Sequence, residues 1–154
     1  MIRQIFDTEV KQAVAREILE ALPEWFGIPE ARENYIAESA SQIFFGAFEG
    51  KRAVGFLCLK ETGRDTAELA VMGVLKERHR KGIGTKLFLE AKAAAAAHGY
   101  SFLQVKTVQM GRYREYDETN RFYLSLGFKE FEVFPALWDE WNPCQVYVIG
   151  LEMA

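Results

Sequence analysis

Hydrophobic and polar positions follow two periods along this chain, and each period predicts a different kind of element. Short runs rich in β-branched and aromatic residues are typical of strands, whereas apolar residues recurring every three or four positions are typical of helices. The strands are expected at 2–6, in two runs within 42–60, and at 66–75, 101–109, 128–134 and 144–153, and the helices at 8–22, 29–41, 82–98 and 118–127.

Capping and turn residues support these boundaries. Thr8 is a typical N-cap for the first predicted helix, and Pro29 suits the first turn of the second. Glu49-Gly50 separates the two β-rich runs within 42–60 and predicts a hairpin. Gly99 marks the end of the third helix.

Two segments carry stronger patterns. The strand over 66–75 is nearly all apolar after Glu68, which predicts that both of its faces are covered and makes Glu68 the exceptional residue. In the helix over 82–98, the residues expected on the buried face recur at helical spacing: Ile83, Leu87, Ala91 and Ala94.

The element order β-α-α-β-β-β-α-β-α-β-β predicts an α/β (mixed α+β) protein, with one mixed sheet covered by helices. With 154 residues, of which 49% are hydrophobic and 14% aromatic, the chain suits a single domain over 1–154 with a substantial core.

Charge and cysteine content narrow the class of protein. A net charge of −3 argues against a general nucleic-acid binder, but five Lys or Arg and one acid lie between Lys76 and Lys86, so a basic patch is local. Cys58 and Cys144 cannot form a disulfide framework. Because there is also no signal-peptide pattern and no apolar run of roughly 18 residues, we expect a cytoplasmic protein without a membrane partner.

The basic patch ends in a glycine-containing turn, HRKGIGTKLF, at 79–88. Gly82 and Gly84 allow a sharp turn from strand to helix, and the first N–H groups of that helix have no internal acceptor. These donors and the helix dipole favour a phosphate, and Arg80 and Lys81 add full charges. The alternative is a tight corner whose cations are merely solvated.

Two nucleotide-binding motifs do not fit this turn. A Walker loop needs four residues between its first glycine and the Gly-Lys pair, and GIGTK does not supply them. The dinucleotide fingerprint needs a third glycine where Leu87 stands.

HRKGIG instead resembles the acyl-CoA signature of the GNAT superfamily of N-acyltransferases, Gln/Arg-x-x-Gly-x-Gly/Ala, with His79 in the usual Gln/Arg position. Two further features are similar to this family. Glu68 stands fourteen residues ahead of Gly82, where some members carry their general base, and NRFYLSLGF at 120–128 is similar to a later family segment that carries an Asn and a Tyr.

The resemblance implies a central mixed, mostly antiparallel sheet of about seven strands flanked by about four helices. It also implies acetyl-CoA as the acyl donor and roles for particular residues: Glu68 as general base and Tyr123 as general acid, with the cofactor held by Met72, Val74, His79, Arg80, Lys81, Gly82, Ile83, Gly84, Thr85 and Asn120. In this scheme the Met72 main-chain N–H faces the thioester oxygen and Val74 pairs with the pantetheine arm. No metal is expected.

The chemistry needs such residues. A primary amine has a pKa of about 10.4, so at neutral pH it must lose a proton before it attacks a thioester. Neither cysteine has the neighbouring His expected of a covalent nucleophile, which favours direct attack by the amine.

The resemblance places the acceptor pocket between LPEWFGIPE and FPALWDEWNPCQ, two aromatic and acidic segments that suit a small cationic amine. Its candidate contacts are Trp25, Tyr116, Trp138 and Asp139. The alternative is that the tryptophans pack a sheet edge or a homodimer contact.

Structural alternatives also remain for the three central residues. Glu68 suits a partly exposed strand end, Tyr123 a core position, and Asn120 the cap of a helix that begins at Asp117 or Thr119. For the whole chain, the alternatives to an N-acetyltransferase are a non-catalytic acyl-CoA sensor and a nucleotide-binding or structural module.

Overall fold

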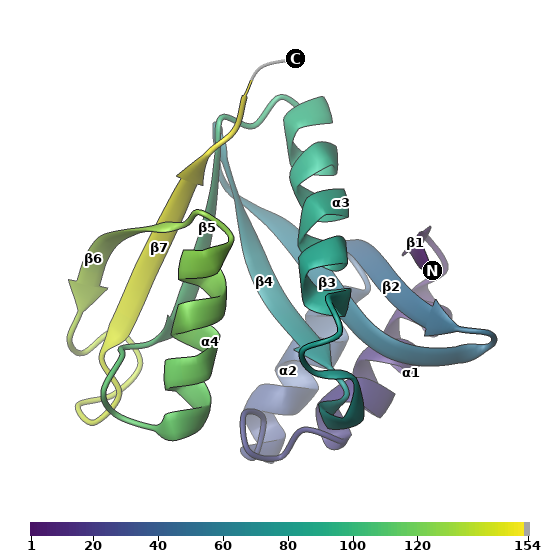
Figure 1. Ribbon diagram of the computed structural model, residues 1–154, viewed down its shortest axis with the longest axis horizontal. Coiled ribbons are helices and arrows are strands. Elements are labelled where there is room, and N and C mark those ends of the chain that lie inside the picture. The colour runs from purple at the N-terminus through teal and green to yellow at the C-terminus, as the bar shows by residue number, and fades with distance from the viewer. Residues whose placement is uncertain (153–154) are drawn as a thin grey trace. The chain divides into compact units, whose positions relative to one another are not determined.

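The computed structural model describes residues 1–152, in which seven strands form one mixed sheet accompanied by four α-helices (Figure 1). The strand order is β1-β2-β3-β4-β5-β7-β6, and β4 and β5 are parallel while the pairs β1–β2, β2–β3, β5–β7 and β6–β7 are antiparallel. The elements are β1 (Ile2–Ile5), α1 (Thr8–Glu20), α2 (Pro29–Ser39), β2 (Ile43–Glu49), β3 (Arg52–Gly63), β4 (Thr66–Val74), the 3-10 turn η1 (Lys76–Arg78), α3 (Ile83–Ala97), β5 (Phe102–Val108), α4 (Arg114–Ser125), β6 (Lys129–Phe134) and β7 (Cys144–Gly150).

The predicted mixed sheet with about seven strands and four helices is therefore confirmed, and the differences lie at element ends. Asp7, not Thr8, caps α1, because its carboxylate accepts a hydrogen bond from the Val10 N–H at 3.0 Å. The predicted last strand extends to Met153, which lies outside the described residues, whereas β7 ends at Gly150.

Helix α4 begins four residues before the predicted start, at Arg114. Two acids in its first turn, Glu115 and Asp117, stabilise the positive end of the helix dipole. Asp117 also accepts a hydrogen bond from the Gly111 N–H at 2.7 Å. The helix therefore starts at neither of the residues considered from the sequence, and Asn120 lies in its interior rather than at its cap.

The described chain divides into two compact units. Unit 1 comprises Met1–Lys60 and Leu69–Ala95, and unit 2 comprises Glu61–Glu68 and the residues from Ala96 onward. The prediction of one domain over 1–154 stays a prediction.

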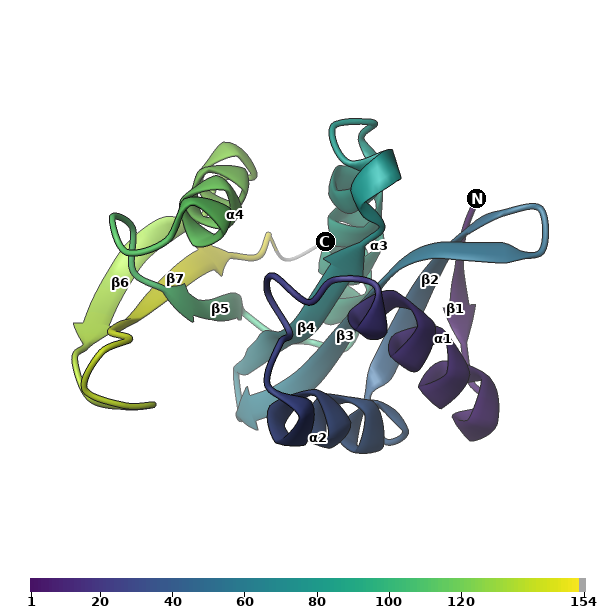
Figure 2. The ribbon, with the colours of Figure 1, turned by 90° about the horizontal axis from the view of Figure 1, so that it is seen from below.

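In unit 1, helices cover both faces of the strands. Helices α1 and α2 lie on one face and α3 lies on the other (Figure 2). A Cβ added at Gly73 of β4 would lie 3.0 Å from Ile18 and Leu22, so the backbone of β4 and the α1 segment are in close contact. A Cβ at Gly55 would lie 3.4 Å from Leu87 of α3. For β4 the prediction that both faces are covered is confirmed only on the face packed against α1, because Ala70, Met72 and Val74 are half-buried and the contact with α3 is made by Gly55 of β3.

The buried face of α3 differs slightly from the predicted one. Leu87 and Ala91 are buried as expected, but the other buried positions are Phe88 and Ala95 rather than Ile83 and Ala94. The alanine run contains too little contrast in hydropathy to fix which of its members faces the core.

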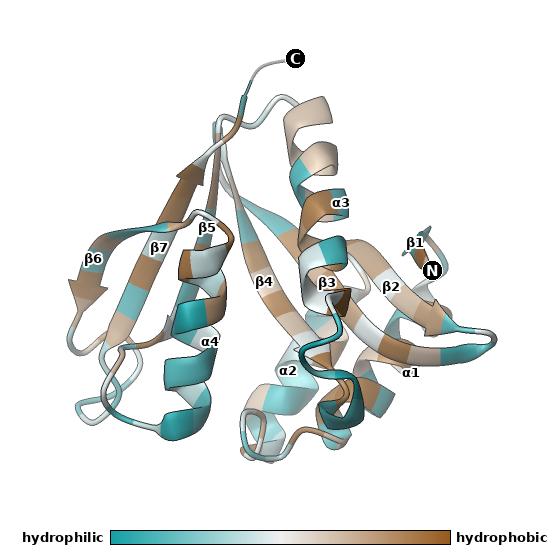
Figure 3. Ribbon diagram, in the orientation of Figure 1, coloured by the Kyte–Doolittle hydropathy of each residue, from teal (hydrophilic) through white to brown (hydrophobic). Residues whose placement is uncertain are grey.

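In unit 2, β5, β7 and β6 carry α4 on one face (Figure 2). Leu103, Val105 and Tyr147 are buried in this unit, and Val105 is opposite Tyr147 in the β5–β7 register. Figure 3 shows that hydrophobic residues make up much of β7, and also much of β3 and β4 in unit 1. The second face of the β5-β7-β6 sheet carries no helix belonging to unit 2 within residues 1–152.

No helix within residues 1–152 combines the length and the apolar character needed to cross a membrane.

The close approach at Gly73 gives a stability prediction. Gly73→Ala places a methyl group against Ile18 and Leu22, so we expect the free energy of unfolding to fall by about 1–3 kcal/mol. Urea unfolding measures this loss. Gly63→Ala is the matched control, because a Cβ there meets nothing within 4 Å. Equal effects of the two substitutions would contradict the packing described here.

Candidate functional site

The start of α3, in unit 1, exposes main-chain donors. The Lys86 N–H donates to the Gly82 carbonyl at 3.0 Å and closes the first turn, so the N–H groups of the three residues before it have no acceptor within the helix. Arg80 has a φ of 62° and Gly82 a φ of 79°, which turn the chain sharply into the helix. A Cβ at Gly82 would meet nothing within 4 Å. This arrangement is suited to binding an anion.

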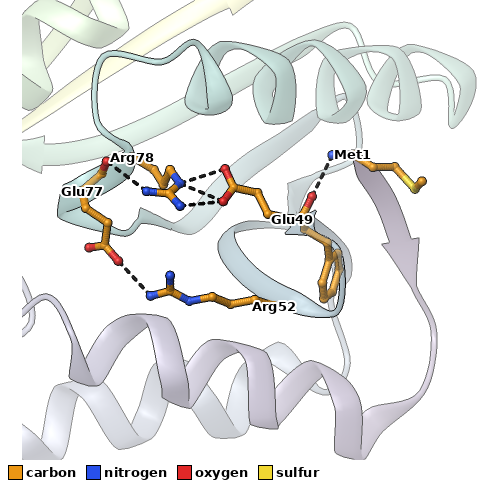
Figure 4. A network of polar contacts seen from close by, with 6 residues as sticks. Met1, Glu49, Arg52, Glu77 and Arg78 are labelled. Carbon is orange, nitrogen blue, oxygen red and sulfur yellow. Dashed lines mark hydrogen bonds and ion pairs between the residues drawn. The ribbon is translucent and has the colours of Figure 1, made fainter.

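Some cations of the basic patch are neutralised and others are not. Lys76 pairs with Glu24. Arg78 pairs with Glu49 (Figure 4), and the hydrogen bonds from the Arg78 guanidinium are the chief cause that lowers the pKa of Glu49. These pairs, together with Arg52–Glu77, fix η1, which leads into the turn. The remaining three cations of the patch have no ion pair within residues 1–152: Arg80, Lys81 and Lys86.

His79 braces the turn through contacts within unit 1. Its Nε2 lies 2.7 Å from the Val74 carbonyl oxygen, and its ring meets that of Trp25 edge-on with centroids 5.7 Å apart. The His79 N–H donates to the Lys76 carbonyl. The ring nitrogen and the main-chain N–H of His79 therefore connect the end of β4 with η1.

The direction of the main-chain groups of Met72 and Val74 follows from the hydrogen bond of Leu75, the residue directly after β4. The Leu75 N–H donates to Val54 at 2.9 Å, so the groups of Leu75 face β3. Backbone groups alternate along a strand, which directs those of Val74 and Met72 to the opposite edge. The pairing of β4 with β5 covers only Thr66 to Glu68 in the described chain.

Glu68 belongs to unit 2 and is only 6% exposed. Its Oε1 lies 3.0 Å from the Nζ of Lys106, whose side chain is about one-third exposed. The ammonium compensates a carboxylate charge that would otherwise be costly to bury. Sequence reasoning found Glu68 but missed Lys106. The only available signal was the alternation of the strand at 101–109, on which Gln104 and Lys106 share a face.

Asn120 is completely buried, and every hydrogen-bonding group of its side chain is engaged within unit 2. Its Nδ2 donates to the carbonyls of Val108, at 2.9 Å, and Tyr116, at 2.6 Å. Its Oδ1 accepts from the Tyr147 hydroxyl at 2.5 Å. This amide therefore joins α4 to β5 and β7.

Tyr123 lies on α4 and is 8% exposed. Its ring contacts those of Phe128 and Tyr147, with centroids 5.8 and 6.4 Å away. These ring contacts fix the position of the side chain within unit 2. A fixed position is compatible both with a proton donor and with a core residue.

The four expected acceptor contacts do not form one cluster in either unit. Trp25 belongs to unit 1, where it contacts His79, and the Tyr116 ring lies 6.0 Å from that of Tyr113. Asp139 accepts hydrogen bonds from the N–H groups of Trp141 and Asn142 and from the Asn142 amide, and these hydrogen bonds lower its pKa. Asp139 therefore folds its own loop, whereas Trp138, beside it, is half exposed.

Neither cysteine is prepared for nucleophilic attack. Both are buried, and burial raises the pKa of Cys144 to about 11 and that of Cys58 still further. A thiol with a raised pKa is protonated at neutral pH, so neither side chain supplies a thiolate.

Comparisons with known proteins agree with this geometry. The acetyltransferase (GNAT) domain model matches residues 39–130. A solved structure described as a GNAT-family acetyltransferase from Desulfovibrio desulfuricans is 19% identical, with a TM-score of 0.83 over 99% of both chains. The ribosomal-protein-S18-alanine N-acetyltransferase of Escherichia coli is 16% identical, with a TM-score of 0.78 over 100% of this chain and 96% of that one.

A third solved structure, an aminoglycoside 6'-N-acetyltransferase complexed with coenzyme A, is 18% identical, with a TM-score of 0.76 over 97% of this chain and 96% of that one. No curated protein was found to match the sequence. At such identities the solved structures establish the fold, whereas the family model covers more than half of the chain.

The buried hydrogen bond between Asn120 and Tyr147 gives a second prediction. Asn120→Ala and Tyr147→Phe each leave a buried polar group without its partner, so the two losses are not additive. A double-mutant cycle measured by urea unfolding is expected to give a coupling energy of about 0.5–3 kcal/mol. Additive effects would show that the two side chains act independently.

Proposed function

Since the chain belongs to the GNAT family of acetyltransferases, we propose that it transfers the acetyl group of acetyl-CoA to the primary amine of a small acceptor, by direct attack in a ternary complex. At neutral pH such an amine is protonated and cationic. The observation that carries the proposal is the exposed start of α3, which combines unpaired N–H groups with three cations that have no acidic partner in the described chain.

The residues of the turn fit the diphosphate of this donor. The N–H groups of Ile83, Gly84 and Thr85 would hold the phosphate oxygens, and Arg80 and Lys81 would neutralise their charge. The open space beside Gly82 leaves room for the anion to approach the backbone. His79 would support the diphosphate site indirectly, because its contact with the Val74 carbonyl holds the end of β4.

The edge of β4 supplies main-chain groups for the rest of the donor. Acetyl-CoA provides an activated acetyl thioester whose departing group is a thiol. The Val74 N–H is suited to pair with the amide-containing arm, and the Met72 N–H to stabilise the negative charge that develops on the carbonyl oxygen. Neither function requires a particular side chain.

In this proposal the residues that transfer protons belong to unit 2. We assign the role of general base to Glu68, whose buried carboxylate is held by Lys106 and would accept the proton that the acceptor amine must lose. Tyr123 is the candidate general acid, which would protonate the departing thiolate. The thiols of Cys58 and Cys144 take no part in the transfer, because their raised pKa values keep them protonated. The aromatic residues Trp25, Tyr116 and Trp138 and the carboxylate Asp139 remain proposed contacts of the acceptor.

The diphosphate site is tested by substitution at the start of α3. Gly82→Val places a branched side chain at a positive φ and in the open space where the anion would lie, so we expect CoA affinity to fall at least about 10-fold, as measured by isothermal titration calorimetry. The control is Gly99→Val at the other end of the same helix, where φ is also positive and the space is also open. Equal affinities of the two variants for CoA would exclude the proposed phosphate site.

The general base is tested separately. Glu68→Gln keeps the shape of the side chain but cannot take a proton, so turnover is expected to fall about 10²–10⁴-fold while the affinity for CoA is retained. Release of free thiol measures turnover. Glu61→Gln is the control, because this exposed carboxylate of unit 2 accepts a hydrogen bond from Tyr100 and has no assigned role. If the Glu68→Gln variant turned over as fast as the wild type, Glu68 would not be the general base. If the wild-type protein bound CoA tightly but acetylated no amine, the result would favour a non-catalytic acyl-CoA sensor.

A further inference from the structure

Unit 2 contains a hollow of about 240 Å³ on the strands β5, β6 and β7 and the segment after β6. Its volume lies below the roughly 300–1,000 Å³ of pockets for drug-sized ligands, so it suits a smaller group. The hollow is lined by Gln104, Lys106, Phe131, Phe134, Leu137 and Val146.

The apolar wall of the hollow depends on a β-bulge. Phe131 and Phe134 are three residues apart on β6, and in a regular strand they would point to opposite faces. The register shifts between Glu130 and Glu132, however, which leaves Phe131 as an extra residue, and both phenylalanines line the same hollow. Phe131 is nevertheless 66% exposed and Leu137 is 54% exposed. An apolar surface built in this way and left open suits an apolar ligand.

At the polar end of the hollow, the charged lining residue is a cation that is paired with a buried carboxylate. Lys106 lines it, and the Nζ of Lys106 is 3.0 Å from the Oε1 of Glu68. The Nε2 of Gln104 donates to the Thr62 hydroxyl at 2.8 Å, so its amide is oriented within the unit. A ligand that enters the hollow meets the ammonium of Lys106, and the carboxylate paired with that ammonium is the buried one of Glu68.

We infer that the acceptor is a free α-amino acid with an apolar side chain. Its ammonium would face Glu68, its carboxylate would face Lys106, and its side chain would occupy the hollow beside Phe131. A polyamine carries only short methylene spacers between its charges, without a branched apolar side chain for the wall, and would meet the like charge of Lys106. This inference rests on the acetyl transfer proposed above and names the substrate class of the same reaction.

The product would be an N-acetyl amino acid. A carbon–nitrogen bond forms between the acetyl carbon and the α-nitrogen, and the carbon–sulfur bond of the thioester breaks. The α-ammonium loses two protons in all, of which one ends on the departing thiol and one passes to solvent through Glu68.

The test compares acceptors that differ in one group. L-leucine, L-leucinamide and 3-methylbutylamine share the side chain and the amine, but only L-leucine carries the carboxylate, and spermidine represents the polyamines. We expect kcat/KM for L-leucine to exceed that for the other three by at least 10-fold. Lys106→Met is expected to abolish this preference, and Lys106→Arg to restore part of it. The control Lys51→Met, in the exposed turn after β2, leaves it unchanged.

The preference is a ratio, so a general loss of activity in the Lys106 variants does not affect the conclusion. Equal or faster turnover of L-leucinamide would overturn the inference in favour of a peptide N-terminus, and faster turnover of spermidine would overturn it in favour of a polyamine. If no amine is acetylated, the proposed function fails, and calorimetric titration of L-leucine into the CoA-saturated protein still decides the binding site. Binding that Lys106→Met removes supports the site, whereas no binding, or binding unaffected by the substitution, contradicts it.

Discussion

Main-chain N–H groups without a protein acceptor are the feature on which the function of this chain depends. Exposed N–H groups that have no acceptor within the protein are available to an external acceptor, and several of them in one region suit an anion or another hydrogen-bonding ligand. Unit 1 contains two such regions, at the first turn of α3 and along the edge of β4 that faces away from β3. Two successive sets of donors suit a long, extended ligand with a diphosphate at one end.

The surrounding charges are arranged so that this region stays positive. Lys76 and Arg78 form ion pairs that hold η1 in place. Arg80 and Lys81 have no ion pair in the described chain, so their charges are available to an external anion. In unit 2 the opposite arrangement holds, because Lys106 compensates the charge of buried Glu68. The same ammonium that compensates this buried carboxylate is the group that we propose as the contact for an anionic group of the acceptor.

Much of the fold could be predicted from the sequence, because its elements follow from local patterns. The turn at 79–88 and Glu68 could also be found, since a glycine pair at a helix start and an acid in an apolar strand are visible as single features. The start of α4 was missed because Gly111 and Asp117 interact across a loop. The interior role of Asn120 was also missed, because its partners lie on three different elements.

The proposed acceptor site was the least predictable part. Aromatic and acidic residues in loops predicted contacts at Trp138 and Asp139, which stay predictions, and Asp139 also accepts hydrogen bonds within its own loop. The hollow beside Lys106 arises from the β5–β7 register and from the bulge in β6, which brings Phe131 and Phe134 to one face. Neither the register nor the bulge has a recognisable signal in the sequence.

The most direct test of the central claim follows the backbone amides themselves by NMR as CoA is added. The amide resonances of Ile83, Gly84 and Thr85 are expected to shift most, in a saturable manner, together with those of Met72 and Val74. Saturable binding of CoA that leaves these five amides unchanged, or no binding at all, would contradict the proposed role of the unpaired N–H groups.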